Sequence, residues 1–219
     1  MQHNDNEPSN ESCPLCANIA VTGFYADKMR SYLSCRNCQL VFVPRAFHLS
    51  PTDERAAYDQ HQNNPNDQGY RKFLSRLAEP LLEKLAPNSF GLDFGSGPGP
   101  TLSLMLEEKG HKVAIYDPFY APDKQALAGH YDFITSTEVV EHLAAPGEEL
   151  DRLWGLLKDG GYLGLMTKQV TGRESFDSWH YKNDPTHISF FSKHSFEYLG
   201  AKWGSAPTFI GADVILFRK

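Results

Sequence analysis

Apolar and polar positions alternate with two periods along the second half of the chain. From Tyr70 to Leu85 the large apolar residues recur at helical spacing, interrupted by Pro80 and ended by Pro87. Short apolar runs then take turns with helical patterns. We expect strands at 90–94, 112–116, 132–137 and 162–167, and helices at 101–109 and 148–157. This alternation predicts an α/β fold with a mostly parallel, Rossmann-like sheet covered on both faces.

The two ends of this region follow other patterns. A helical pattern near 195–199 precedes two short apolar runs, PTFIG and DVILFRK, which predict a closing antiparallel pair. Residues 45–69 hold prolines, a glycine and many polar residues, which predicts a linker with a short helix near 53–58. We therefore divide the chain into a disordered tail (1–12), a cysteine segment (13–44), the linker (45–69) and the α/β domain (70–219).

The cysteine segment carries the pattern C-x2-C-x18-C-x2-C at Cys13, Cys16, Cys35 and Cys38. Two close pairs joined by a strand-like stretch supply the four thiolates of a tetrahedral zinc site. A disulfide pair or a redox motif is the alternative, which a reducing compartment and the two matched pairs oppose. A closed site leaves no position for chemistry, so we expect structural zinc in a self-contained ribbon that grips substrate or packs on the domain.

Composition and charge exclude several classes of protein. Hydrophobic residues make up 41% of the chain and charged residues 22%, as is typical of globular domains. The net charge of -6 provides no basic field, so nucleic acid is disfavoured as a partner. No signal-like start is present, and no apolar run approaches the ~20 residues of a membrane span. We expect a cytoplasmic protein without membrane contact, and these patterns leave its oligomeric state open.

A glycine-rich turn, LDFGSGPGP, follows the first strand of the domain. Gly95, Gly97 and Gly99 let a ligand approach the backbone, and the helix after Pro100 offers free amides. The spacing matches the GxGxxG pattern of NAD sites poorly. Asp117, at the end of the next strand, is placed to accept the ribose hydroxyls of either kind of cofactor. A tight turn without a ligand is the alternative for the glycines alone.

Four segments in this order resemble a known motif series: LDFGSGPGP, YDP at 116–118, YDFITSTEVVEHL and LKDGGYLGLMT. The series is similar to that of class I methyltransferases dependent on S-adenosylmethionine (SAM), over residues 70–219. Small ribbons of the CPLC and CRNC form resemble those that precede many bacterial methyltransferase domains. The resemblance implies SAM as cofactor beside the structural zinc.

The resemblance also implies which residues hold SAM. Its methionine end would lie against Asp93, Gly95, Ser96, Gly97 and Gly99, its ribose against Asp117, and its other side against Ser136, Thr137 and Glu138. Only thirteen residues separate the ribose-binding aspartate from Tyr131, where many relatives carry an acidic residue for adenine. We expect main-chain groups near Pro118, or the ring of Phe119 or Tyr120, to replace that residue.

The loop after the strand at 162–167 should border the methyl acceptor, because ligands of open α/β sheets bind at the carboxyl ends of strands. It reads FDSWHYKNDPTHISFF (176–191). Aromatic side chains there would suit a binding site for a planar or sugar-like acceptor. The alternative is that the rings only pack the loop onto the domain. His187 and Tyr181 are the candidate bases, with His142 a weaker one; a purely structural histidine is the alternative for His187.

Glu138, Glu141 and His142 stand at spacings i, i+3 and i+4, so a helix beginning there would place them on one face, able to chelate a divalent ion. The TEVVEH string is similar to the motif of quinone-pathway O-methyltransferases, in which such groups can hold a metal beside the acceptor oxygen. The alternative is that Glu138 borders SAM while the other two cap, solvate or pack the helix.

Together these patterns predict a SAM-dependent methyltransferase that acts on a small-molecule acceptor such as a sugar, a quinone or another metabolite. An RNA or protein methyltransferase is one alternative. A SAM-fold binding module without turnover is the other, with the ribbon as its recognition part.

Overall fold

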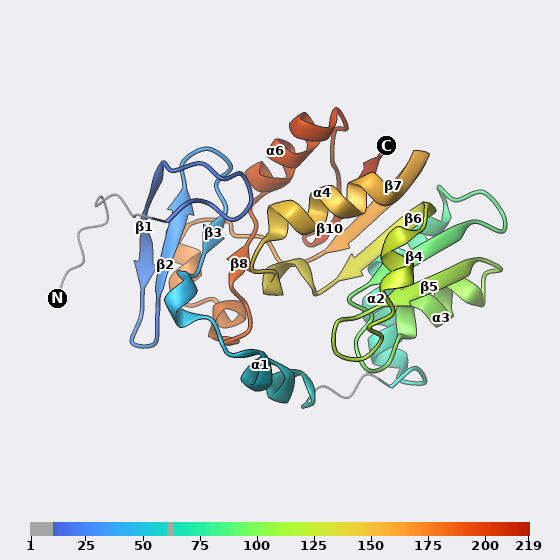
Figure 1. Cartoon of the computed structure of the whole chain (residues 1–219), viewed down its shortest axis with the longest axis horizontal. Coiled ribbons are helices and arrows are strands. Elements are labelled where there is room, and N and C mark those ends of the chain that lie inside the picture. The colour runs from blue at the N-terminus through green and yellow to red at the C-terminus, as the bar shows by residue number, and fades with distance from the viewer. Residues whose placement is uncertain (1–10, 61–63) are drawn as a thin grey trace.

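A computed structural model describes residues 11–60 and 64–219, so residues 1–10 of the predicted tail lie outside the described part. A six-stranded sheet in the order β5-β4-β6-β7-β10-β9 forms the body of the molecule (Figure 1). The first four strands are parallel, and the last two pair antiparallel. The strands are β4 (Phe90–Phe94), β5 (Lys112–Tyr116), β6 (Tyr131–Thr137), β7 (Leu157–Met166), β9 (Thr208–Ile210) and β10 (Val214–Arg218). The predicted fold class is confirmed.

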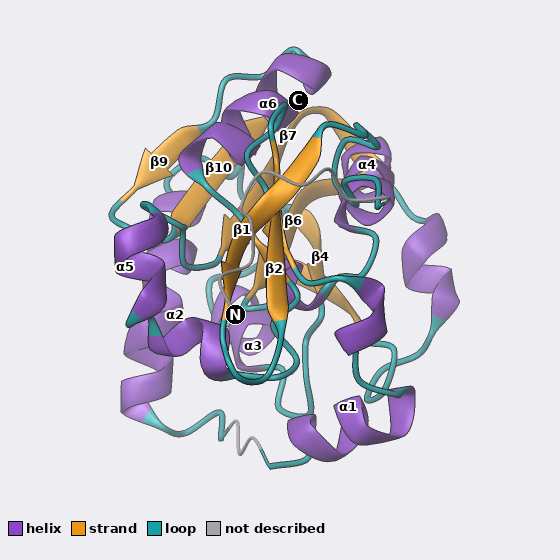
Figure 2. Ribbon diagram, turned by 90° about the vertical axis from the view of Figure 1, so that its left-hand side faces the viewer, coloured by secondary structure: helices purple, strands orange, loops and turns teal. Residues whose placement is uncertain are grey.

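Helices cover both faces of this sheet, as Figure 2 shows for α2 on one side and α4 on the other. Strand β10 illustrates the reason, because successive side chains of a strand point to opposite faces. Val214 and Leu216 join one core cluster, and Ile215 and Phe217 join the other. The first cluster holds α2 (Gln68–Leu82) and α3 (Thr101–Glu107), and the second holds α4 (Pro146–Leu156) and α6 (Lys193–Trp203).

Helix α2 continues through Pro80, so the predicted interruption at this residue was wrong. The helix begins at a cap in which the Asp67 side chain accepts from the amides of Gly69 and Tyr70. Proline in the last turn removes one main-chain hydrogen bond. Burial of the apolar stripe, Leu74, Leu77, Ala78 and Leu81, keeps the last turn on the sheet.

The cysteine segment contributes to a second sheet, which has the order β1-β2-β3-β8 and is antiparallel throughout. Its strands are β1 (Val21–Ala26), β2 (Ser31–Cys35), β3 (Val41–Phe42) and β8 (Ser189–Phe190). The expectation of a self-contained ribbon was wrong, because β8 belongs to the loop that follows β7. Val41 pairs with Phe190 and Phe42 with Ser189, so ribbon and loop share one sheet.

An aromatic cluster fills the space between this sheet and α5 (Arg173–Asp177). The ring of Phe176 lies 5.0 Å from that of Tyr32, 5.2 Å from that of Phe24 and 5.4 Å from that of Phe190. These edge-on contacts join both ends of the loop to the ribbon. Of the two readings of the aromatic loop, packing is therefore the one that the structure supports for these rings.

The linker folds into α1 (Pro51–Tyr58), close to the predicted short helix. Ser50 caps it by accepting from the amide of Asp53, and Pro51 occupies its first turn. Short 3-10 turns complete the described elements: η1 (Arg45–Phe47), η2 (Lys124–Ala128), η3 (Val140–His142) and η4 (His180–Asn183). Within the described part of the chain, no helix has the length and apolar character needed to cross a bilayer.

Because ribbon and domain share a sheet and a core cluster, we expect them to unfold in one transition. Phe176→Ala should lower the free energy of unfolding by about 3–5 kcal/mol, the usual cost of deleting a buried aromatic ring. Denaturant titration followed by circular dichroism and by tryptophan fluorescence measures this. Phe47→Ala, at a 42% exposed ring, serves as the control and should change stability by less than about 0.5 kcal/mol. Two separate transitions in the wild type would contradict the shared core.

Candidate functional site

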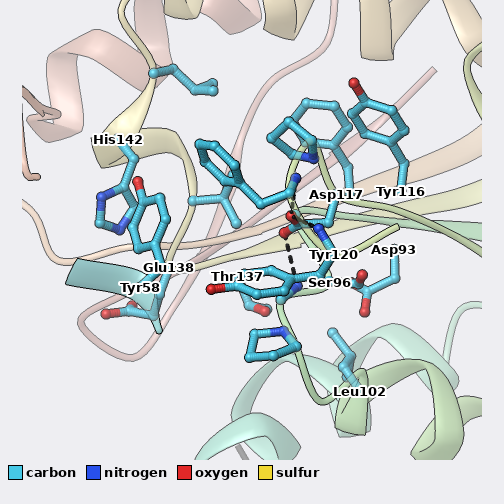
Figure 3. Close-up of a pocket in the computed structure, with 18 of the residues that line it drawn as sticks. Tyr58, Asp93, Ser96, Leu102, Tyr116, Asp117, Tyr120, Thr137, Glu138 and His142 are labelled. Carbon is cyan, nitrogen blue, oxygen red and sulfur yellow. Dashed lines mark hydrogen bonds between the residues drawn. The ribbon is translucent and has the colours of Figure 1, made fainter. Parts of the chain in front are cut away.

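A cavity of about 680 Å³ opens at the carboxyl ends of β4, β5 and β6. Figure 3 shows its two ends, with Asp93, Ser96 and Asp117 at one and the rings of Tyr58 and His142 at the other. The glycine turn between β4 and α3 forms the floor of the first end. The second end is bordered by η3 and by His187 of the loop after β7.

The glycine turn has the backbone that its sequence predicts. Gly95 and Gly97 have φ angles of 78° and 65°, in the left-handed region that favours glycine. The amide of Gly95 donates to the carbonyl of Tyr116 at 2.7 Å, which holds the turn against the end of β5. A side chain at Gly95 would also collide with Val139. The turn is therefore fixed by its own backbone and leaves space above it.

Asp117 organises the second edge of the same end. One carboxylate oxygen accepts from the amide of Gly97 at 3.0 Å, and the other accepts from the amides of Phe119 and Tyr120 at 2.9 and 3.0 Å. Charge-assisted bonds of this type fix a carboxylate strongly. Oδ1 uses both of its lone-pair directions for these amides, whereas Oδ2 has one left and can still accept a hydroxyl from a ligand.

Two buried carboxyl groups face this cavity. Asp93 accepts from the hydroxyl of Thr135 at 2.8 Å, and burial, with the charge of Asp117, raises its pKa to about 6. Glu138 has a φ of 52°, a strained backbone for a residue other than glycine. Burial and the neighbouring Glu141 raise the pKa of Glu138 to about 8. Neither carboxyl has a compensating cation at hydrogen-bond distance among the described residues.

Orphaned polar atoms show that this end fits a polar ligand. Ser96 Oγ and Glu138 Oε1 are buried and have no hydrogen-bond partner among the described residues, and both residues line the cavity. Buried polar groups in folded proteins are nearly always paired, so an unpaired donor or acceptor in a cavity wall points to a bound partner. The amino and carboxylate groups of an amino-acid moiety would supply such partners.

The structure brings together most of the residues predicted to hold SAM. Those that line the cavity are Asp93, Gly95, Ser96, Gly97, Asp117, Pro118, Thr137 and Glu138. Gly99 and Ser136 do not line it. Ser136 lies on β6 next to Thr137, and neighbouring strand residues face opposite sides. Phe119 and Tyr120 also line the cavity, as expected of groups that replace the missing acidic residue.

The other end of the cavity is a group of rings. The ring of His142 lies 4.6 Å from that of His187 and 5.2 Å from that of Tyr58. Tyr58 also contacts Phe119, at 5.8 Å between ring centres. Tyr58, the last residue of α1, thus lies between Phe119 and the histidine pair. Tyr58 was missed by the sequence analysis, because a linker shows no periodicity that relates it to a distant pocket.

His187 is held in one tautomer. Its Nδ1 lies 2.7 Å from the carbonyl oxygen of Tyr181, so Nδ1 carries the proton and Nε2 is the acceptor. The Nε2 atom lies 3.8 Å from Asp184 Oδ2. Burial, together with the neighbouring His142, lowers the pKa of His187 to about 4. The ring is therefore neutral at physiological pH.

Tyr181 lies behind the cavity wall and does not line it. Its hydroxyl donates to Glu141 and lies 3.2 Å from the hydroxyl of Thr167. Burial and the charge of Glu141 raise the pKa of Tyr181 well above its usual range. Burial also raises the pKa of Glu141 to about 7. The tyrosine therefore orients the buried glutamate and, through its main-chain carbonyl, His187.

The predicted helical face of Glu138, Glu141 and His142 was wrong. The 3-10 turn begins only at Val140, and Glu138 precedes it with a left-handed backbone, so the three residues do not share a helical face. A different set comes together instead. Ligand atoms of Glu141, His142 and His187 lie within 4.8 Å of one another, a donor set compatible with a divalent cation.

The four cysteines meet as predicted. Their sulfur atoms lie within 4.8 Å of one another, with 3.4 Å between the sulfurs of Cys13 and Cys38 and 3.5 Å between those of Cys16 and Cys35. A tetrahedral zinc ion with Zn–S bonds of about 2.3 Å needs sulfur separations of about 3.8 Å. Disulfides need about 2 Å, and all four thiols are free. The cluster fits a structural zinc ion.

Comparison with known proteins relates the chain to a family. Residues 62–205 match a family model described as a methyltransferase domain, which is more than half of the 219 residues. A search of curated proteins finds no match. The match begins after the ribbon and α1, so it covers neither the cysteine cluster nor Tyr58.

Solved structures share the fold. A didemethyltoxoflavin N1-methyltransferase of Burkholderia thailandensis, with its substrate and S-adenosylhomocysteine (SAH) bound, has a TM-score of 0.54 at 16% identity, over 90% of this chain and 98% of that one. One chain of the Haloferax volcanii complex between the Trm112 methyltransferase activator and a methyltransferase has a TM-score of 0.53 at 13% identity. The match covers 78% of this chain and 98% of that one. Magnesium protoporphyrin IX methyltransferase of Synechocystis, with SAH bound, has a TM-score of 0.50 at 17% identity. The match covers 79% of this chain and 95% of that one.

The cysteine geometry predicts that chelator-washed protein retains about one equivalent of zinc, because four converging thiolates, three of them buried, bind it far more tightly than a surface site. Elemental analysis by mass spectrometry measures this, and Cys35→Ser should lose the ion. Zinc-free, folded protein with four titratable thiols would contradict the site. A second equivalent that disappears in His187→Ala would place a cation at the cluster with Glu141.

The raised pKa of Asp93 predicts a pH dependence of stability. Its folded pKa of about 6 lies above its ordinary value of 3.8, so the stability it contributes is present below pH 3.8 and is lost as pH rises through 6. The free energy of unfolding of wild type minus that of Asp93→Asn should therefore fall between pH 4 and 7, by at most about 3 kcal/mol. Denaturant titration across this range measures it.

Asp132 provides a control of opposite sign. Partial burial is outweighed there by hydrogen bonds from Lys158 and the amide of Phe90, which lower its pKa. The corresponding difference for Asp132→Asn should rise with pH near and below 4. A flat difference for Asp93→Asn would mean that this carboxyl is solvated.

Proposed function

Because the chain belongs to the family of methyltransferase domains, we propose that it transfers a methyl group from SAM to a small-molecule acceptor, with His187 as the general base. The single observation that carries the proposal is the continuous cavity, which joins the glycine turn at one end to the histidine pair at the other. Both partners of a methyl transfer must meet in one space, and this cavity has two chemically different ends.

The residues of the first end suit the parts of SAM. Ser96 and Glu138, with their unpartnered oxygens, would meet its amino-acid moiety, beside the turn at Gly95 and Gly97. Oδ2 of Asp117 would accept a ribose hydroxyl through its remaining lone pair. The rings of Phe119 and Tyr120 would contact adenine, since both line the same edge.

The residues of the second end suit an acceptor that loses a proton. When bound, SAM would supply a methyl group on a sulfonium sulfur: the lone pair of the acceptor would bond to the methyl carbon in line as the carbon–sulfur bond breaks, and SAH would leave as the thioether. His187 Nε2 takes the proton of the attacking hydroxyl or carbon acid, because its other nitrogen is committed to the carbonyl of Tyr181. His142 and Tyr58 pack around the acceptor and exclude water. Tyr181 acts as a positioning residue from behind the wall.

Charge and size favour a small acceptor. The cavity volume lies within the range of small-molecule sites. Arg152 is the only lysine or arginine among the lining residues of the described chain, and it pairs with Glu149, whereas a nucleic-acid substrate needs several free cations. Two solved structures of the same fold are methyltransferases of small molecules by their printed names. An RNA acceptor is accordingly the less supported alternative.

Isothermal titration calorimetry with SAH and with NAD tests the cofactor part of the proposal. We expect SAH to bind and NAD not to bind. The acceptor part is tested with any compound that a screen of small hydroxylated metabolites shows to be methylated. His187→Ala should lower turnover by about 10²- to 10⁴-fold, the usual contribution of a general base, and change the affinity for SAH less than about twofold.

Tyr181→Phe should lower turnover less than His187→Ala does. The hydroxyl of Tyr181 orients Glu141 and its own ring, whereas its main-chain carbonyl, which holds His187, is kept in this variant. Lys193→Met is the control, since the side chain of Lys193 is 70% exposed and does not line the cavity. Preferential binding of NAD, or no response of folded protein to SAH, would refute the methyltransferase proposal. Normal turnover in His187→Ala would refute the role of the base alone.

A further inference from the structure

The ribbon reaches the acceptor end of the cavity through one buried side chain. Arg30 lies just before β2, at the turn of the ribbon hairpin, and is only 8% exposed although it is an arginine. A guanidinium group is rarely buried unless its hydrogen bonds are satisfied. The groups that accept hydrogen bonds from Arg30 therefore indicate the structural role of this buried side chain.

Those partners are main-chain carbonyls of the loop that carries His187. Arg30 donates to the carbonyls of Lys182, Asp184 and Pro185 at 2.6, 2.9 and 3.1 Å. Its remaining bond is to the hydroxyl of Tyr32 at 3.0 Å. The three carbonyls are more than 150 residues away in sequence, so the loop is folded around a cation that another segment supplies.

The ribbon holds the guanidinium in place from its own side. Asp27 accepts from the amides of Met29 and Arg30 at 2.8 and 3.0 Å and from the hydroxyl of Tyr32 at 3.1 Å. Asp27 thus fixes the turn that carries Arg30, and the hydroxyl of Tyr32 links Asp27 to the guanidinium. Strand β2, which follows, ends at Cys35 of the metal cluster.

The same arc of backbone positions both histidine rings. The carbonyl of Tyr181 accepts from His187, and the carbonyl of Thr186 lies 3.2 Å from His142 Nδ1. The three carbonyls that bind Arg30 lie between these two. Converging carbonyl dipoles repel one another unless a cation lies among them, so the position of each ring depends on the guanidinium.

We propose that Arg30 is the positioning residue through which the cysteine ribbon holds His187 and His142 at the acceptor end of the cavity. The ribbon then serves the transfer reaction by shaping the loop, and it contributes no group that contacts the acceptor. Arg30 lies outside residues 62–205, so the methyltransferase family match does not assign it a role. The importance of His187 rests on the proposed function, whereas the structural dependence of the loop on Arg30 does not.

Hydrogen exchange of the full chain, saturated with zinc and SAH, tests the dependence. In Arg30→Gln the amides at 186–188 should exchange at least about tenfold faster, because three hydrogen bonds to a charged group are lost. Amides of β6 and α4 should be unchanged. Lys28→Gln is the matched control, because Lys28 is an exposed cation two residues away on the same hairpin, and it should behave as wild type.

Two further measurements separate positioning from a general loss of structure. Long-range nitrogen–proton spectra should report a single Nδ1–H tautomer for His187 in the wild type and a mixture in Arg30→Gln. Arg30→Lys keeps the charge but not the planar fork, so it should restore part of the protection and of the tautomer signal. Once an acceptor is known, kcat should fall in Arg30→Gln with the KM for SAM unchanged.

Wild-type exchange and a single tautomer in folded Arg30→Gln would overturn the proposal. If Arg30→Gln does not fold, Arg30→Lys decides: faster exchange confined to 184–188 supports the proposal, and wild-type exchange overturns it. Binding of SAH by the wild-type protein tests the proposed function separately. A chain that fails to bind SAH but shows the predicted exchange would refute only the proposed function.

Discussion

The pairing of β3 with β8 is the interaction on which the rest of this arrangement depends. Two residue pairs, Val41 with Phe190 and Phe42 with Ser189, connect the small cysteine ribbon to the loop that follows β7 in the α/β domain. The amide of Val43 extends the connection by donating to the carbonyl of Ile188 at 2.9 Å. Strand β8 has only two residues and lies at the edge of this sheet beside β3, so the order of this part of the loop depends on the ribbon.

This connection explains how a long loop can carry precise groups. The loop between β7 and α6 holds little regular structure, and its backbone polar groups must find partners outside the domain's own sheet. The ribbon supplies them through β3 and Arg30, and the aromatic cluster around Phe176 excludes water. His187 consequently lies on a loop whose backbone is held by hydrogen bonds to the ribbon.

The two ends of the cavity differ in the ionisable groups that are buried there and in how burial shifts their pKa values. Asp93 and Glu138, buried carboxyls that lack a cation at hydrogen-bond distance among the described residues, have raised pKa values at the end with the glycine turn. Burying a carboxyl in this way costs stability, and such groups are found most often at functional sites. At the other end, burial keeps His187 neutral, which is the state that can accept a proton.

The sequence by itself determined the sheet, the glycine turn, the role of Asp117 as the partner of that turn and the meeting of the four cysteines. Each of these depends on local periodicity or on short spacing, which the order of residues records directly. The tertiary structure alone decided that Tyr58 covers the cavity, that the aromatic loop packs on the ribbon, and that Arg30 holds the loop of His187. These contacts join segments far apart in the chain, and their energy comes from packing and desolvation that no local pattern encodes.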